Sequence, residues 1–138
     1  MKVENAVYPS AEQLTNAVTN GSRQPIVMVN LVKFKDKSVY ADARASDLTG
    51  RAAYARYSVE MREYVEAHGG RILFLGEVGS LVIGEVEDLW DAVALVEYPS
   101  MEAFVQIATS PEVAVFGVHR EAGLAGQLLI QTVEAAGI

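Results

Sequence analysis

The most apolar stretch of the chain, residues 26 to 34 (IVMVNLVKF), has apolar side chains on both sets of alternating positions. The even set is Ile26, Met28, Asn30, Val32 and Phe34, and the odd set is Val27, Val29, Leu31 and Lys33. Successive side chains of a strand point to opposite faces, so this pattern predicts a strand that is buried on both sides. Asn30 is its one uncharged polar side chain. Burying its amide unpaired would cost on the order of a few kcal/mol, so we expect it to have hydrogen-bond partners.

Two other segments have a helical pattern. In PSAEQLTNAVTNG, Ser10 and Gln13 have capping-box spacing and Gly21 provides a stop, which predicts a short helix within residues 9 to 21. Residues 51 to 70 form a longer amphipathic helix that Thr49 can cap. Its apolar stripe is Tyr54, Tyr57, Met61, Tyr64, Val65 and His68.

The rest of the chain completes an alternation of strands and helices. RILFLGEVGSLVIGE predicts a strand with a hairpin-like extension, and WDAVALVEY predicts another strand. Two helical pieces follow, the second capped by Ser110 before Pro111, and QLLIQTVE predicts a last strand. Residues 35 to 50 show neither period, and we expect this long connection to act as a lid.

The order strand, helix, strand, strand, helix, strand is the split βαβ arrangement of a ferredoxin-like fold, an α+β protein with a four-stranded antiparallel sheet. With 138 residues, we expect a single domain over residues 1–138. Residues 9–21 would form an N-terminal helical appendage and residues 26–134 the ferredoxin-like core.

The two apolar faces of the first strand have a consequence for assembly. In this fold the helices cover only one face of the sheet, so the other apolar face needs a second cover. The same face of a second copy is the simplest one. We therefore expect a homodimer formed sheet to sheet.

Charge and composition exclude several classes of partner. The formal net charge is −7, which repels phosphate backbones and anionic lipid surfaces, so neither nucleic acid nor a membrane is an expected partner. The chain has no cysteine, and its two histidines lie about fifty residues apart without metal-ligand spacing, so no metal site is expected. The N-terminus lacks the apolar core of a signal peptide, and we expect a cytoplasmic protein.

Five segments in order resemble the domain-of-unknown-function family 1330: MVNLVKF, HGGRILFLGEV, WDAVALVEYPSMEAF, SPEV and HREAGLAGQLLI. The resemblance implies membership of the dimeric alpha-beta barrel superfamily, in which ferredoxin-like protomers pack their sheets into a barrel across a two-fold axis. Relatives in that superfamily include cofactor-free oxygenases of aromatic polyketides, muconolactone isomerases, haem-degrading oxygenases and chlorite dismutases. They share a pocket between sheet and helices rather than one chemistry, so the residues must indicate the function.

Three residues are candidates for catalysis. Asn30 is either an oxyanion-type donor to a ligand oxygen or a structural group bonded to backbone or to a neighbouring side chain. His119, or failing it Tyr57, would be the base, while surface placement is the alternative for His119. Haem-degrading relatives carry an Asn on the first strand, a Trp on the third and a His on the last helix, and Asn30, Trp90 and His119 match those element types.

Four further residues are candidates for binding a flat ligand: Tyr54, Trp90, Tyr98 and Arg120. Core packing is the alternative for the tyrosines, and a salt bridge is the alternative for Arg120. The leading hypothesis is a small-molecule-binding protein that acts without a cofactor, as an oxygenase or isomerase of a carbonyl or phenolic compound. The rival hypotheses are a non-catalytic metabolite-binding or stress-related homodimer, and a scaffold dimer without a pocket.

Overall fold

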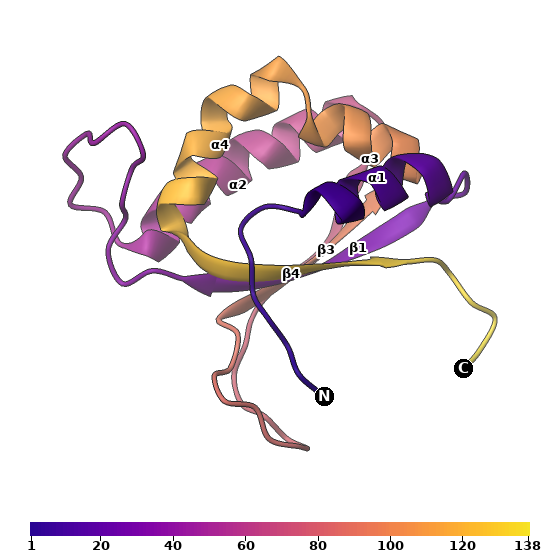
Figure 1. The fold of residues 1–138 in the computed structure, drawn as a ribbon, viewed down its shortest axis with the longest axis horizontal. Coiled ribbons are helices and arrows are strands. Elements are labelled where there is room, and N and C mark those ends of the chain that lie inside the picture. The colour runs from indigo at the N-terminus through magenta and orange to yellow at the C-terminus, as the bar shows by residue number, and fades with distance from the viewer.

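The computed structural model describes residues 1–138 and contains one four-stranded antiparallel sheet with strand order β2-β3-β1-β4 (Figure 1). The elements are α1 (Ala11–Asn20), β1 (Ile26–Phe34), α2 (Gly50–Ala67), β2 (Arg71–Glu77), β3 (Ala92–Tyr98), α3 (Met101–Ala108), α4 (Pro111–Gly123) and β4 (Leu124–Thr132). This order and pairing confirm the predicted ferredoxin-like fold and the extra N-terminal helix.

Local capping signals set the helix ends. Ser10 Oγ accepts a hydrogen bond from the backbone N–H of Gln13, whose side chain accepts one from the backbone N–H of Ser10, so the predicted capping box starts α1. Thr49 caps α2 and Ser110 caps α4, with Pro111 in the first turn. None of the residues of α1 is buried, and this helix lies beside α3 (Figure 1). None of the four helices combines the length and apolar composition that a bilayer span requires.

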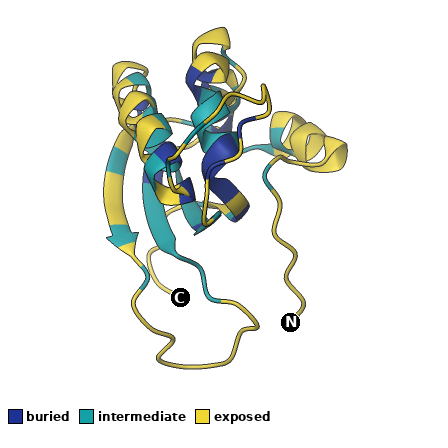
Figure 2. Ribbon diagram, turned by 90° about the vertical axis from the view of Figure 1, so that its left-hand side faces the viewer, coloured by how far each residue is buried: buried dark blue, intermediate teal, exposed yellow.

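The even residues of β1 face the helices. Ile26, Met28 and Val32 are at most 3% exposed and belong to the core between the sheet and the helices, where Figure 2 shows much of the buried part of the chain. Val65 of α2 and Phe116 of α4 are also buried in this core. The register therefore places Asn30 on the inner, helix-covered face of the sheet.

The odd residues of β1 lie on the opposite face, which no helix covers in the protomer. Directly paired residues share a face, so the strand register extends this face over all four strands. The apolar residues of the outer sheet face are Val27, Val29, Leu31, Phe74, Val93, Leu95, Leu128 and Ile130, and the polar residues Arg71, Glu97 and Thr132 lie at one end of it. Phe74 and Ile130 are 53% and 45% exposed. The protomer thus leaves a continuous apolar surface across its sheet.

Two connections differ from the sequence-based expectation. The extension after β2 contains no strand: residues 78 to 91 form an irregular connection to β3 that leaves Val82 and Ile83 almost fully exposed. The connection between β1 and α2 is not a lid over the inner face. It folds back on itself through the Lys37–Thr49 bridge and joins the end of α4 through a hydrogen bond from Val39 N to Ala122 O.

Candidate functional site

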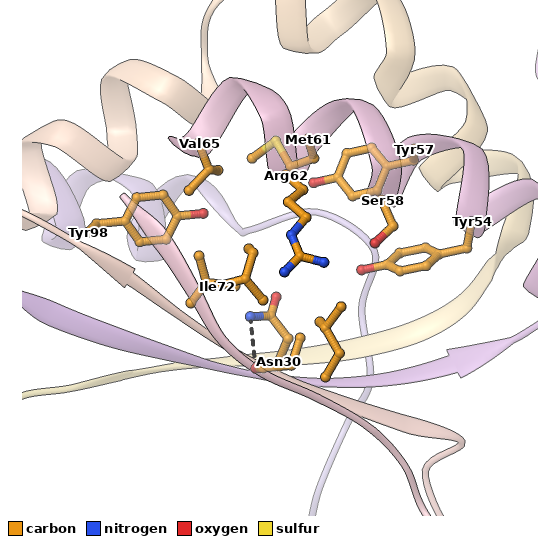
Figure 3. Close-up of a pocket in the computed structure, with 12 residues that line it drawn as sticks. Asn30, Tyr54, Tyr57, Ser58, Met61, Arg62, Val65, Ile72 and Tyr98 are labelled. Atoms are coloured by element: carbon orange, nitrogen blue, oxygen red, sulfur yellow. Dashed lines mark hydrogen bonds between the residues drawn. The ribbon is translucent and has the colours of Figure 1, made fainter. Parts of the chain in front are cut away.

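A cavity of about 60 Å³ lies between α2 and the inner face of the sheet (Figure 3). Most of its wall is apolar, and its polar groups are few. The lining residues are Asn30, Tyr54, Tyr57, Ser58, Met61, Arg62, Val65, Ile72, Leu75, Ala94, Val96 and Tyr98. At roughly 10–15 Å³ for each water molecule, the space suits a few waters or a small organic molecule.

Three tyrosines provide the phenol groups of this cavity. Tyr54 and Tyr57 come from α2 and Tyr98 from the end of β3, and Figure 3 shows their hydroxyl oxygens pointing into the space between them. The rings are held by aromatic neighbours, with 5.3 Å between the ring centroids of Tyr54 and Tyr57 and 5.1 Å between those of Tyr98 and Phe104. None of the three hydroxyls hydrogen-bonds a protein group, so all three are available to a ligand.

Burial decides the protonation of these phenols. Desolvation raises the pKa of Tyr54, of Tyr57 and of Tyr98 above the ordinary value, because the phenolate is the form that loses hydration. Negative charge on Tyr57 would raise the pKa of the other two further. The tyrosines are therefore neutral hydrogen-bond donors, which fits ligand binding better than the role of base that the sequence suggested for Tyr57.

Both the nitrogen and the oxygen of the Asn30 side-chain amide form hydrogen bonds within the protein. Its Nδ2 donates to Met28 O and Ala94 O, each at 3.3 Å, and its Oδ1 accepts from Nε2 of Gln127 at 2.9 Å. The structural alternative for this residue therefore has direct support in the contacts. The Asn30 side chain also forms part of the cavity floor (Figure 3).

Gln127 connects Asn30 with Arg120. Gln127 is only 8% exposed, and its Oε1 accepts from Nη2 of Arg120 at 2.7 Å, while Arg120 also donates to Val7 O. Arg120 thus forms no salt bridge with an acidic residue, which was the alternative expected for it. Gln127 was not among the predicted site residues. The only sequence signal for it is a polar side chain at the start of an apolar last strand, and its closeness to Asn30 depends on the strand register.

His119 and Trp90 lie outside this cavity. His119 of α4 lines a second pocket with the connection before α2, where its Nδ1 is 2.6 Å from the hydroxyl of Tyr40. Trp90 precedes β3 by two residues, and its buried Nε1 has no hydrogen-bond partner. The structure therefore brings together Asn30, Tyr54, Tyr57 and Tyr98, joins Arg120 to them through Gln127, and separates His119 and Trp90 from them. No group of three or more His, Asp or Glu side chains has an arrangement that could hold a metal ion.

The fold and cavity define a ferredoxin-like α+β protein with space for a small molecule between α2 and the sheet. The chain belongs to the family described as Domain of unknown function (DUF1330), whose pattern matches residues 38–133. This match confirms the resemblance seen in the sequence.

Several solved structures are similar to this chain. The crystal structure of the methylated RPA0582 protein is similar with a TM-score of 0.86 and 30% identity, covering 96% of this chain and 97% of that one. A second structure of RPA0582, a protein of unknown function from Rhodopseudomonas palustris, has a TM-score of 0.86 and 29% identity. The match covers 97% of this chain and 100% of that one. A Dabb family protein with a ferredoxin-like fold from Mesorhizobium loti has a TM-score of 0.49 and 14% sequence identity. The match covers 81% of this chain and 98% of that one. No curated protein matches the chain.

Proposed function

We propose that this chain is a small-molecule-binding protein whose ligand occupies the cavity between α2 and the sheet and presents an oxygen acceptor to the tyrosines. The observation that carries this proposal is the convergence on the cavity of three phenol hydroxyls that have no protein partner. Each of these hydroxyls can donate a hydrogen bond to a carbonyl or phenolic oxygen of a bound ligand. The apolar wall would hold the carbon part of such a compound.

The lining residues favour binding over proton abstraction. A general base must lie within hydrogen-bond reach of the proton it removes, and none of the lining residues is a histidine or a carboxylate. The tyrosines stay protonated, and the Asn30 amide is already bonded within the protein. Non-catalytic metabolite binding is therefore better supported than a cofactor-independent oxygenase or isomerase.

The second part of the proposal is a homodimer joined through the outer sheet face. Eight apolar side chains from four strands form most of this face, and leaving them in water would be unfavourable in a monomer. A two-fold axis places the same surface on both sides, so the face can cover itself.

Titration of the ¹⁵N-labelled protein with phenol and with cyclopentanone tests the ligand site by NMR. We expect saturable shifts of the backbone amides of Ala94 and Val96, which line the cavity. Replacing Tyr54, Tyr57 or Tyr98 by Phe should weaken binding of these probes by a factor of about 2 to 10, the range for one neutral hydrogen bond. Tyr64→Phe is the matched control, because the Tyr64 hydroxyl lies near Glu112, outside the cavity.

Two results would count against this proposal. The first is the absence of any shift in residues that line the cavity, or an equal loss of affinity in Tyr64→Phe. The second is faster exchange of the α-protons of cyclopentanone with deuterated water in the presence of the protein. Such exchange would show proton abstraction and would restore the enzymatic hypothesis.

A further inference from the structure

The second pocket is an open space of about 360 Å³ at the end of the molecule where the connection before α2 meets α4. Its lining differs in character from that of the tyrosine cavity, since most of it is polar or charged. The lining residues are Tyr40, Arg44, Ala45, Ser46, Asp47, Leu48, Arg56 and His119. None of them lines the cavity under α2.

The connection that forms this pocket has a defined structure. Ser38 N donates to Leu48 O at 3.0 Å, and Ser38 Oγ donates to Ser46 Oγ at 2.8 Å, so the two arms of the loop are bonded to each other. Tyr40 is 6% exposed and packs with Ala53 and Ala122 in a small core of its own. Compact loops closed and packed in this way are frequently functional.

The tip of the loop holds an unusual backbone conformation. Ala43 has φ of 63°, in the left-handed region that side chains other than glycine rarely adopt. The Asp42 and Arg44 side chains on either side form a salt bridge, and the Arg44 guanidinium lies 4.7 Å from the ring centroid of Tyr40. The backbone at Ala43 is therefore strained, next to the residue, Arg44, that lines the pocket.

His119 lines the pocket and keeps one ring nitrogen free of protein partners. Its Nδ1 lies 2.6 Å from the hydroxyl of Tyr40, and its Nε2 has no protein partner. When the Tyr40 hydroxyl donates to Nδ1, the neutral imidazole carries its proton on Nε2, and the imidazolium carries one there as well. The Tyr40 contact therefore makes neutral His119 a donor from Nε2, and the imidazolium is a donor from that atom without help from Tyr40.

The charges around the pocket favour a single negative charge. Arg44 is balanced by Asp42, whereas Arg56 takes part in no salt bridge of the structure. Asp47 is the one carboxylate in the lining, and it opposes a ligand of high negative charge. One unpaired guanidinium beside one neutral or positive imidazole suits a monoanion, and the planar fork of arginine matches a carboxylate.

We propose that the pocket formed by residues 40 to 48, Arg56 and His119 binds a small organic carboxylate. Arg56 pairs with its oxygens, and His119, oriented by Tyr40, donates to it from Nε2. Ala45 and Leu48 lie beside this charged group in the lining and would contact the carbon part of the acid. This site is separate from the tyrosine cavity and does not depend on the function proposed for it.

Titration with benzoate, monitored on the imidazole nitrogens by long-range ¹H–¹⁵N correlation, tests the proposal. The chain has two histidines, so His68, which stacks on Tyr64 outside the pocket, is an internal control. We expect saturable shifts of His119 but not of His68, and no comparable shifts with benzamide, the uncharged analogue. Arg56→Gln should weaken benzoate binding on the order of tenfold, and Asp47→Asn should strengthen it.

Three controls establish that benzoate binds in this pocket and that a loss of affinity in Arg56→Gln comes from the missing guanidinium. Arg23→Gln removes an exposed arginine outside both pockets and should leave the affinity unchanged. Tyr54→Phe should also leave it unchanged, which excludes binding of benzoate in the tyrosine cavity. Arg56 is exposed, so its replacement is compatible with folding, and the backbone amide spectrum verifies this.

Each of the following results would overturn the inference. Benzoate causes no shift of the His119 imidazole nitrogens, or the Arg56→Gln variant binds benzoate as tightly as the unmodified protein does. Benzamide binds as tightly as benzoate, which would show that the negative charge of the ligand does not contribute to binding. Inorganic phosphate binds more tightly than benzoate, which overturns the assignment to carboxylates.

Discussion

Gln127 Nε2 donates a 2.9 Å hydrogen bond to Oδ1 of Asn30 and links β4 to β1 on the inner face of the sheet. Gln127 in turn accepts from Arg120, so two half-buried groups and one buried amide form a continuous chain. Buried polar chains of this kind are stable only when each member is satisfied. Asn30 is therefore both a floor residue of the cavity and a structural link between two strands.

Gln127→Leu should lower the free energy of unfolding by about 1–3 kcal/mol, because it leaves the Asn30 carbonyl oxygen and the Arg120 guanidinium without their partner. Urea denaturation measures this loss. In a double-mutant cycle with Asn30→Leu, we expect a coupling of about 1 kcal/mol. Gln131→Leu, on the same strand but exposed, should change the stability by no more than about 0.5 kcal/mol. Purely additive effects of the two buried replacements would contradict the link.

Ile130→Glu should dissociate the proposed homodimer. The substitution places a carboxylate on the outer sheet face, where a sheet-to-sheet contact would bury it without a partner. Sedimentation velocity at micromolar concentration should give a dimer for the unmodified chain and a monomer for the variant. Val115→Glu, at a 74% exposed position of α4, should leave the dimer intact. A monomeric unmodified protein would refute the proposal.

The tyrosine cavity should make the protein sensitive to alkali. The folded protein holds the pKa of Tyr54, of Tyr57 and of Tyr98 above the ordinary value of 10.0, so unfolding releases their protons at high pH. Their contribution to stability is complete below pH 10 and is lost as the pH rises from there toward the raised values. Melting temperatures measured across this range should therefore fall, and less steeply in a variant with Phe at all three positions. An equal fall in both proteins would show that these phenols are not the cause.

The start of α2 touches the end of α4 through two glycines, which leave no space for a side chain. A Cβ at Gly123 would overlap the carbonyl oxygen of Gly50 and lie 2.9 Å from the backbone nitrogen of Tyr54. Gly123→Ala should therefore destabilise the protein by about 1–3 kcal/mol, as overpacking usually does. Gly117→Ala, in the same helix but with open space around it, should stabilise the protein by about 0.5–1 kcal/mol. Thermal or urea unfolding of the two variants compares them, and a similar effect of both would contradict the close approach.

Much of the secondary structure could be predicted because its signals lie within a few residues. The Ser10–Gln13 capping box, the Thr49 cap and the alternation over residues 26 to 34 are all local patterns. The predictions failed where structure depends on a distant partner. The extension after β2 has suitable strand residues, but no neighbouring strand pairs with them.

The site was harder to predict for the same reason. The tyrosines of α2 lie on one stripe, so their common orientation follows from helical periodicity, and Asn30 stands out as a polar residue in an apolar strand. His119 was a reasonable candidate by residue type, yet α4 places it against Tyr40 rather than in the cavity under α2. Its position depends on how α4 packs against the loop, which no pattern of adjacent residues specifies.

The order of the elements, the apolar character of both faces of β1 and the family could all be predicted from the sequence, because they follow from residue types and short spacings. Which face of β1 meets the helices, and therefore the side on which Asn30 lies, is known only from the packing of the helices against the sheet. The alternation of side chains shows that the strand has two faces. Because both faces are apolar, it does not show which one packs against the helices. Gln127, 97 positions from Asn30 in the chain, becomes its hydrogen-bond partner only through the pairing of β4 with β1.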